Sequence, residues 1–235
     1  MQEVLFKDLG RAEYKQVWDY QESLLQDNVR IKTDARQRDI QADTTNYLLF
    51  VEHPPVYTLG KSGHMEHVLI DEDSMLQKGI QFFKINRGGD ITFHGPGQIV
   101  GYPILDLERF YTDIGKYLRN LEEVIILTLK TYGIEGQRSE GETGVWIEPG
   151  VKGRERKICA IGVRCSRWIT MHGFAFNVNT DLDYFGNIVP CGIQDKQVTS
   201  LEKELGHPLD IEAVKAEVRR RFEEVFDVEL RTLSE

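Results

Sequence analysis

Short strand-like segments separated by turn residues fill the middle of the chain, and they constrain its fold more than any other feature. Residues 47–52 and 56–59 are mostly apolar or aromatic, and Pro54 and Pro55 lie between them. Because proline has no backbone N–H to donate to a neighbouring strand, the pair indicates a turn between two strands. Residues 81–86 form another predicted strand, which runs into a glycine-rich stretch.

The second half of the chain adds three predicted strands, and the N-terminus adds one. Residues 145–147, 157–165 and 168–177 are strand-like, and the short gap between the last two predicts a hairpin. Residues 4–9 form a short predicted strand near the start of the chain.

Apolar side chains at helical spacing occur in three longer segments. The first follows the N-terminal strand and ends near Arg36, the second covers residues 113–132 and stops at Gly133, and the third follows a capping Asp210. No repeat, low-complexity tract or linker divides the 235 residues. We therefore expect a single domain over residues 1–235, of the α/β class.

The net charge of −9 limits the classes of partner. General nucleic-acid binding depends on clustered Lys and Arg, so we expect no nucleic-acid partner. No stretch approaches about 18 consecutive apolar residues and no leader pattern begins the chain, so we expect a soluble, cytoplasmic protein without membrane contact. The densest basic run lies within residues 152–167 and is either a solvated face or a docking patch for an acidic partner.

Three cysteines, Cys159, Cys165 and Cys191, lack the spacing of disulfide pairs or metal sites. A cytosolic chain of this length needs no disulfide, so at least one thiol is a candidate for reactivity. Cys191 lies between Pro190 and Gly192 on a predicted turn, whereas the other two lie in a predicted strand. Most turn cysteines are inert, but we expect the sulfur of Cys191 to be less buried than those of Cys159 and Cys165.

Two glycine-containing motifs could also carry chemistry. Residues 87–98 read RGGDITFHGPGQ, and their glycines would let the backbone approach a ligand closely. A glycine-rich hairpin with a buried histidine is an equally good interpretation, because the motif fits neither the dinucleotide nor the phosphate-loop pattern. Residues 157–162 read KICAIG, where Lys157 opens an otherwise apolar strand, although a surface lysine would look the same.

A third motif, HGFAFN at residues 172–177, precedes the PCG triplet at 190–192. In this order the four motifs resemble those of the lipoyl(octanoyl) transferases, the octanoyl-[acyl carrier protein]:protein N-octanoyltransferases, over roughly residues 48–192. The resemblance implies an α/β fold with a larger mixed sheet plus a smaller sheet flanked by helices, like that of biotin and lipoate protein ligases.

The resemblance also implies an activity. Such an enzyme moves an octanoyl or lipoyl group from the thioester of acyl carrier protein to a specific lysine of a lipoyl domain, which is a step of protein lipoylation. The acceptors would be the lipoyl domains of 2-oxoacid dehydrogenases and the glycine cleavage H protein. The loop at residues 148–156 looks longer and more basic than is usual in the family, which leaves the approach to Lys157 open.

Site residues carry over from the family by motif. The catalytic nucleophile, which forms a thioester intermediate, matches Cys191, and the residue that activates it matches Lys157. Positions that contact the acyl substrate match Arg87, Gly88, Gly89, Asp90, Ile91, Thr92, Phe93, His94, Ala160, Ile161, Gly162, Gly173, Phe174 and Ala175.

The residue types suit this chemistry. A thiol is a weak nucleophile until it ionises, and Lys157 could hold Cys191 as thiolate by charge or accept its proton. Lys157, or less favourably His94, would take the proton of the incoming lysine.

Thioester-to-amide exchange needs no nucleotide, so we expect no cofactor and no metal. The octanoyl slot would have apolar walls, for which the candidates are Ile91, Phe93, Ile161, Phe174 and Phe176.

Three other functions compete with acyl transfer. An ATP-dependent lipoate or biotin protein ligase would share the fold but would activate its acid as an adenylate and need no thiol. A binding protein without catalytic activity would leave lipoyl lysines unmodified. A metal enzyme would have to use His64, Glu66 and His67, which lack the spacing of a helical zinc motif.

Overall fold

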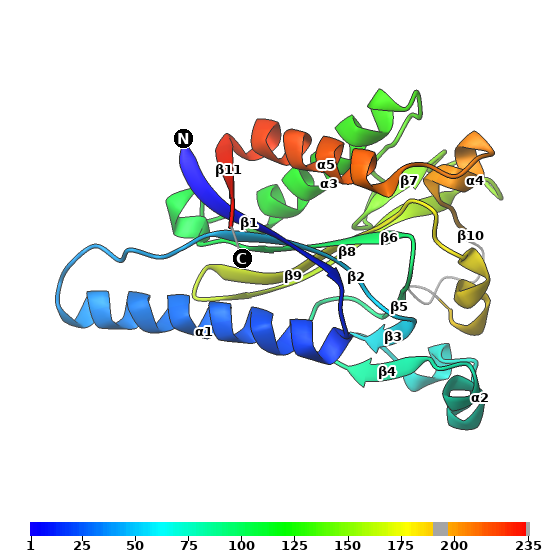
Figure 1. Cartoon of the computed structure of the whole chain (residues 1–235), viewed down its shortest axis with the longest axis horizontal. Coiled ribbons are helices and arrows are strands. Elements are labelled where there is room, and N and C mark those ends of the chain that lie inside the picture. Colours follow the sequence, from blue (N-terminus) through cyan, green and yellow to red (C-terminus); the bar gives the residue numbers. More distant parts are fainter. Residues whose placement is uncertain (190–196, 234–235) are drawn as a thin grey trace.

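The computed structural model describes residues 1–189 and 197–233, so Cys191 lies outside the described residues. Within them, a larger mixed sheet has the strand order β10-β8-β9-β6-β2-β1-β11, and β7 pairs with β8 beside this path (Figure 1). Its strands are β1 (Gln2–Arg11), β2 (Tyr47–Glu52), β6 (Gln98–Ile104), β7 (Val145–Ile147), β8 (Arg156–Ser166), β9 (Ile169–Asn177), β10 (Gln197–Val198) and β11 (Val228–Thr232).

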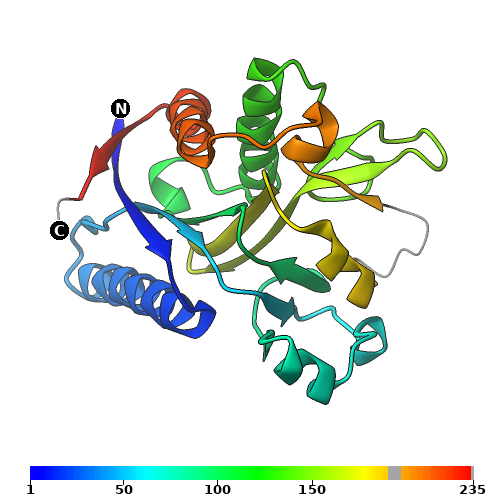
Figure 2. The same ribbon diagram turned by 45° about the vertical axis from the view of Figure 1, so that its right-hand side comes forward.

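A smaller sheet has the order β4-β3-β5 and lies beside α2 (Figures 1 and 2). Its strands are β3 (Val56–Leu59), β4 (Gln81–Lys84) and β5 (Ile91–His94). The α-helices are α1 (Tyr14–Gln37), α2 (Glu72–Gln77), α3 (Ile114–Thr131), α4 (Leu201–Leu205) and α5 (Ile211–Phe226), and the 3-10 helices are η1 (Met65–His67), η2 (Leu107–Arg109) and η3 (Leu182–Asn187). The predicted fold class, with a larger and a smaller sheet flanked by helices, is confirmed.

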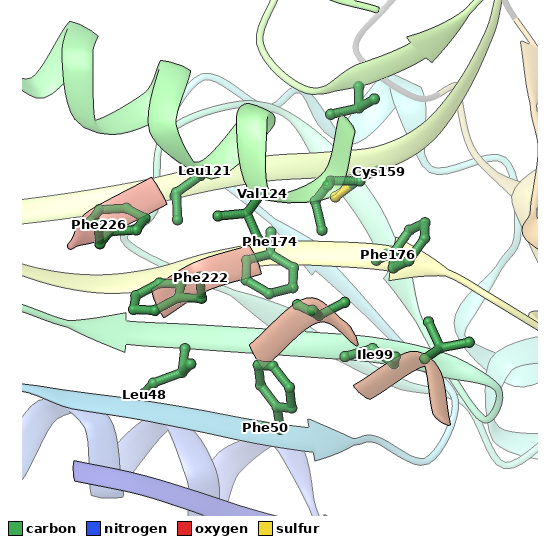
Figure 3. Close-up of a cluster of buried hydrophobic side chains, with 14 of the residues drawn as sticks. Leu48, Phe50, Ile99, Leu121, Val124, Cys159, Phe174, Phe176, Phe222 and Phe226 are labelled. Atoms are coloured by element: carbon green, nitrogen blue, oxygen red, sulfur yellow. The ribbon is translucent and has the colours of Figure 1, made fainter. Parts of the chain in front are cut away.

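Helices cover both faces of the larger sheet. On one face, α3 and α5 pack on a core that includes Phe174 and Phe176 of β9 (Figure 3). On the other face, α1 packs through Val17 and Leu25 in a second cluster. No helix among the described residues combines the length and apolarity that a membrane span requires.

Most predicted elements are confirmed. Strands 47–52, 56–59 and 145–147 have the expected bounds, and β8 and β9 form the expected hairpin. Asp210 caps α5 by accepting a hydrogen bond from the backbone N–H of Glu212. The sequence interpretation does not separate β5 from β6 inside the glycine-rich segment, and it misses α2, α4 and β11.

We expect the core between α5 and the sheet to dominate stability. Phe222 is fully buried and stacks on Phe226 with ring centroids 4.4 Å apart. Phe222→Ala should lower the free energy of unfolding by about 3–5 kcal/mol, because it removes a buried ring and leaves a cavity. Urea denaturation measures this change. The same truncation at Leu76, which is 80% exposed, should stay within about 0.5 kcal/mol, and equal losses for the two variants would contradict this account.

Candidate functional site

A cavity of about 670 Å³ lies between the larger sheet and the glycine-rich segment. The face of the larger sheet that α1 covers forms the floor of the cavity. In this part of the face, small residues of β8 and β9 lie opposite each other. Ala160 of β8 lies opposite Ala175 of β9, and Gly162 lies opposite Gly173. Because side chains alternate along a strand, positions two residues apart share a face. Ala160 and Ala175 therefore leave space that larger side chains would fill, whereas Gly173 is needed because a Cβ there would lie 2.1 Å from the Gly101 carbonyl oxygen.

The glycine-rich segment closes over this floor at short range. The backbone N–H of Gly88 donates to the carbonyl of Val163 at 3.0 Å. A Cβ on Gly162 would lie 2.9 Å from the Gly88 carbonyl oxygen, and a Cβ on Gly60 would lie 2.3 Å from that of Gly89. Glycine at positions 60 and 162 is therefore required by close approach of the backbone.

Arg87 anchors the glycine-rich segment to the smaller sheet. Its Nη2 donates to the Thr58 carbonyl at 2.7 Å and to Thr58 Oγ1 at 3.1 Å, and its Nη1 donates to the Gly88 carbonyl at 2.9 Å. The guanidinium is buried and lines the cavity. Arg87 therefore shapes the cavity through bonds to the backbone, in addition to any contact with substrate.

A chain of hydrogen bonds fixes the tautomer of His94. Asn177 Nδ2 donates to the Thr199 carbonyl, so Asn177 Oδ1 accepts from Gln98 Nε2 at 2.9 Å. Gln98 Oε1 is then the acceptor for His94 Nδ1–H at 2.9 Å. Burial, with a contribution from His53, lowers the pKa of His94 well below its usual value. His94 is therefore neutral and a weak proton acceptor, which disfavours it as the base for the incoming lysine.

Lys157 is half-buried and lines the cavity. It lies on β8 between β7 and β10, where it pairs with Trp146 on one side and Val198 on the other. Its Nζ lies 4.6 Å from the centroid of the Trp146 ring, and its carbonyl accepts the backbone N–H of Thr199 at 3.0 Å. These contacts contradict the interpretation of Lys157 as a snorkelling surface side chain.

The described residues on each side of the segment that carries Cys191 are held by backbone contacts, and Val198 lines the cavity. The backbone N–H of Val189 donates to the carbonyl of His67 at 2.9 Å, and Val198 pairs with Lys157. The other two cysteines are poor nucleophiles. Cys159 is fully buried and Cys165 partly so, and burial raises the pKa of each thiol. Among the cysteines, Cys191 therefore stays the candidate.

The structure brings almost all of the predicted substrate-contacting residues to the cavity. Phe93 is the exception, because it stacks on Tyr184 at 4.6 Å and packs against Phe185, outside the lining. Phe176, expected as a wall, lies in the core on the opposite face of the sheet, and Phe174, two residues before it and also expected as a wall, belongs to the same core (Figure 3). The described predicted residues that line the cavity are Lys157, Arg87, Gly88, Gly89, Asp90, Ile91, Thr92, His94, Ala160, Ile161, Gly162, Gly173, Phe174 and Ala175.

Sequence reasoning missed several buried polar residues of the lining. Tyr14 and Tyr102 line the cavity, and Tyr14 stacks on His94 with ring centroids 5.8 Å apart. Gln98, Asn177 and His172 also line it. Gln98, Asn177 and His172 lie inside the recognised motifs, so the sequence could have identified them as site residues. The helical pattern marks Tyr14 only as an apolar position of α1.

The basic run at residues 152–167 is largely compensated by carboxylates. Arg156 pairs with Glu148 at 2.5 Å and with Glu204 at 2.6 Å, and Arg164 pairs with Glu22 at 2.7 Å. Arg154 also pairs with Glu148, at 2.5 Å. The run therefore ties β8 to α4 and α1, and its value as a docking patch for an acidic partner is reduced.

The metal interpretation gains no support. His67 Nδ1 lies 2.5 Å from Asp90 Oδ2, and the His64 ring packs edge-on against His67. Over residues 1–189 and 197–233, no group of three or more His, Cys, Asp or Glu side chains could hold a metal ion.

Comparison with known proteins places these features in a family. The family described as the lipoyl protein ligase A/B catalytic domain matches residues 13–223. A protein of Flavobacterium johnsoniae named octanoyltransferase is 59% identical, over 97% of this chain and 98% of its own length.

Two solved structures share the fold. A bipartite lipoate protein ligase from Thermoplasma acidophilum has a TM-score of 0.70 at 21% identity, covering 100% of this chain and 88% of that one. A biotin protein ligase from Aquifex aeolicus has a TM-score of 0.51 at 13% identity, covering 96% of this chain and 70% of that one. The sequence match, which extends over nearly the whole chain, shows that the protein belongs to the lipoyl protein ligase A/B catalytic domain family.

Proposed function

We propose that this protein is an octanoyltransferase of protein lipoylation that carries the octanoyl group on Cys191 and uses Lys157 to ionise that thiol. The family and the near-full-length similarity to a protein named octanoyltransferase support octanoyl transfer. The observation that carries the residue roles is the position of Lys157. It lines the cavity, and its strand pairs with β10, which follows the segment containing Cys191.

The ATP-dependent ligase alternative is not favoured. The ligase from Thermoplasma acidophilum is 21% identical, so its similarity concerns the fold alone, whereas the octanoyltransferase relative is 59% identical. A binding protein without activity is likewise not favoured, because the relative that matches almost the whole chain is named as an enzyme.

The acyl chain would lie on the small-residue floor. Val100 of β6 and Ile91 of β5 give the cavity apolar surface, while Ala160 and Ala175 leave room for a chain of methylenes. Each buried CH₂ contributes about 0.8 kcal/mol, so the length of the slot would select the length of the chain.

In the first half-reaction, the Cys191 thiolate attacks the carbonyl carbon of the donor thioester. The bond from that carbon to the donor sulfur breaks, and the leaving thiolate takes a proton from the Lys157 ammonium. Backbone N–H groups near Gly162 or Gly192 would stabilise the oxyanion. The products are the octanoyl thioester of Cys191, a carrier thiol and a neutral Lys157 amine.

In the second half-reaction, the acceptor lysine enters as an amine after losing one proton to solvent. Its nitrogen attacks the Cys191 thioester, and the nitrogen proton passes to Lys157 as the amide forms. The thiolate of Cys191 and the ammonium of Lys157 are thereby regenerated, and no nucleotide is consumed.

We propose acyl carrier protein as donor and lipoyl domains as acceptors, including those of 2-oxoacid dehydrogenases and the glycine cleavage H protein. The lipoylation system of Thermoplasma acidophilum pairs a ligase of this fold with its E2 lipoyl domain, which is consistent with this acceptor class. A single catalytic domain over residues 1–235 and a cytoplasmic location stay predictions.

The covalent step can be tested by mass. Incubation with octanoyl-acyl carrier protein, without acceptor, should add one octanoyl group to the peptide that contains Cys191, because the thioester cannot be discharged to a lysine. Hydroxylamine should release the adduct. Cys191→Ser should not form this thioester, and Lys157→Ala should form it at least about tenfold more slowly, because the thiol ionises less readily. Continued octanoyl transfer by Cys191→Ser at the wild-type rate would refute the covalent route.

The acyl slot can be tested by filling its floor. Ala160→Leu should lower kcat/KM for an octanoyl donor by about tenfold or more, because the added side chain occupies space that the acyl chain needs. The loss should be smaller for a butanoyl donor. Ala213→Leu, on the exposed side of α5, is the matched control and should leave both donors unaffected. An equal loss for both donors would argue against a slot along Ala160.

A further inference from the structure

Two buried tyrosines and a histidine form a group of rings beside the cavity. Tyr14 of α1 and Tyr102 of β6 line the cavity. The His53 ring packs against both, with its centroid 5.1 Å from that of Tyr14 and 5.9 Å from that of Tyr102. All three residues are almost fully buried, and none takes part in the steps proposed above. Two of them nevertheless bound the space in which the acyl chain would lie.

Hydrogen bonds fix the direction in which the Tyr102 hydroxyl donates. His53 Nδ1 lies 2.8 Å from the carbonyl oxygen of Ala12, which can only accept, so Nδ1 carries a proton. Burial lowers the pKa of His53 to about 4, so the ring is neutral and its Nε2 is an acceptor. Tyr102 Oη lies 2.8 Å from Nε2 and therefore donates its proton to His53. The Tyr102 oxygen keeps lone pairs but has no proton to offer to a ligand.

The Tyr14 hydroxyl still has its proton to donate. Among the described residues, none forms a hydrogen bond with this hydroxyl, although Tyr14 is only 2% exposed. Burial raises the pKa of both tyrosines, and nearby Tyr14 adds to the rise for Tyr102. Water usually satisfies buried polar groups that lack a protein partner, and its removal is unfavourable unless a ligand replaces its hydrogen bonds.

The register of the larger sheet separates Tyr102 from Lys157 along the strands. Continuing the pairing of β6 with β9 places Tyr102 beside Gly173, which pairs with Gly162 of β8. Gly162 follows Lys157 by five residues on the same strand. With a rise of about 3.3 Å per residue, the two positions lie roughly 15 Å apart.

An extended octanoyl chain is shorter than this separation. With C–C bonds of about 1.5 Å at tetrahedral angles, an octanoyl chain spans about 9 Å and a dodecanoyl chain about 14 Å. A chain that begins beside Lys157 and follows the floor of the cavity towards Tyr102 therefore stops short when it has eight carbons and reaches the hydroxyls when it has twelve.

The volume of the cavity does not set this limit by itself. If each carbon takes about as much room as a water molecule, about 30 Å³, eight carbons occupy about 240 Å³. The cavity holds about 670 Å³. Longer chains would find space, so their exclusion requires a chemical cause.

We propose that the hydroxyls of Tyr14 and Tyr102 form a polar stop that sets the upper limit of acyl-chain length. This inference rests on the proposed function, because it places the acyl carbonyl beside Lys157. An octanoyl chain leaves the two hydroxyls to water. A longer chain displaces that water and gives no hydrogen bond in return, because a methylene neither donates nor accepts. Tyr14 and Tyr102 are thus specificity-determining residues of the slot.

The test compares donors of two chain lengths. Transfer to a lipoyl domain is measured from octanoyl- and dodecanoyl-acyl carrier protein, and the readout is the dodecanoyl-to-octanoyl ratio of kcat/KM. Tyr14→Phe should raise this ratio by about five- to tenfold, because it removes the hydroxyl and keeps the ring. Tyr102→Phe should change it in the same direction, and the double variant should raise it further. Because both donors are measured on one preparation, a loss of folded protein cancels in the ratio.

Tyr117→Phe is the matched control. Tyr117 is fully buried in the core beneath α3 and α5 and is not part of the cavity lining, so its substitution should leave the ratio unchanged. An equal rise in Tyr117→Phe and Tyr14→Phe would refute the polar stop, because general loosening of the core would then explain both.

The remaining outcomes separate this inference from the proposed function. If the wild type transfers octanoyl groups but Tyr14→Phe and Tyr102→Phe keep the wild-type ratio, the polar stop is refuted and the proposed function stands. If the wild type transfers no octanoyl group from the carrier protein, the proposed function fails and the inference fails with it.

A second measurement uses the wild type alone and covers the case in which the variants do not fold. A hydroxyl on the last carbon of a dodecanoyl chain can accept from Tyr14 and donate to the Tyr102 oxygen. We expect 12-hydroxydodecanoyl-acyl carrier protein to have a kcat/KM at least about fivefold higher than the dodecanoyl donor, because the hydroxyl replaces lost hydrogen bonds. A purely apolar slot would favour the dodecanoyl donor, and that result would overturn the proposal.

Discussion

The pairing of alanine with alanine and of glycine with glycine across β8 and β9 is the constraint on which the site depends. A sheet that is covered on both faces ordinarily fills each face with side chains, because protein interiors are close-packed. Here Ala160 and Ala175 leave part of one face without bulk, and Gly162 and Gly173 admit the close approach of the Gly88 and Gly101 backbone. The opposite face carries Phe174 and Phe176 into the core. The sheet is thus fully packed on its α3 and α5 side and hollow where the glycine-rich segment crosses it.

The hollow is kept open by backbone contacts. The Gly88 N–H bonds to Val163, and Arg87 is bonded to Thr58 on the smaller sheet, so the segment above the floor is supported at two points. These two contacts place the backbone of Gly88 close to β8 and explain why the segment needs arginine at position 87, where the side chain bonds to β3. A loop held by its own backbone and by a neighbouring sheet can bound a cavity without filling it.

The sequence predicted the elements whose pattern is local. Tyr47–Glu52 and Val145–Ile147 have the expected strand bounds, and α5 begins after its Asp210 cap, because strand composition and capping act over a few residues. Most of the described motif residues also line one cavity. Long-range partners could not be predicted in the same way: nothing local connects Arg156 to Glu204, or Tyr14 of α1 to His94. The expectation that Phe93 and Phe176 line the slot rests on their being aromatic and in a motif, but the side of a strand that each faces is set by register.

The proposed chemistry requires Lys157 to bind a proton firmly enough to ionise Cys191 and yet to release it to the departing carrier thiolate. These demands conflict if the ammonium is held too strongly, since a proton trapped on Lys157 could not reach the leaving sulfur. Lys157 Nζ lies 4.6 Å from the centroid of the Trp146 ring, and a cation–π contact of this kind contributes about 0.5–2 kcal/mol to holding the side chain in place. Trp146 pairs with Lys157 across β7 and β8, and the glycine at position 144 leaves room for the lysine methylenes. One side chain, placed in this way along the cavity, would then serve both proton transfers of the proposed mechanism.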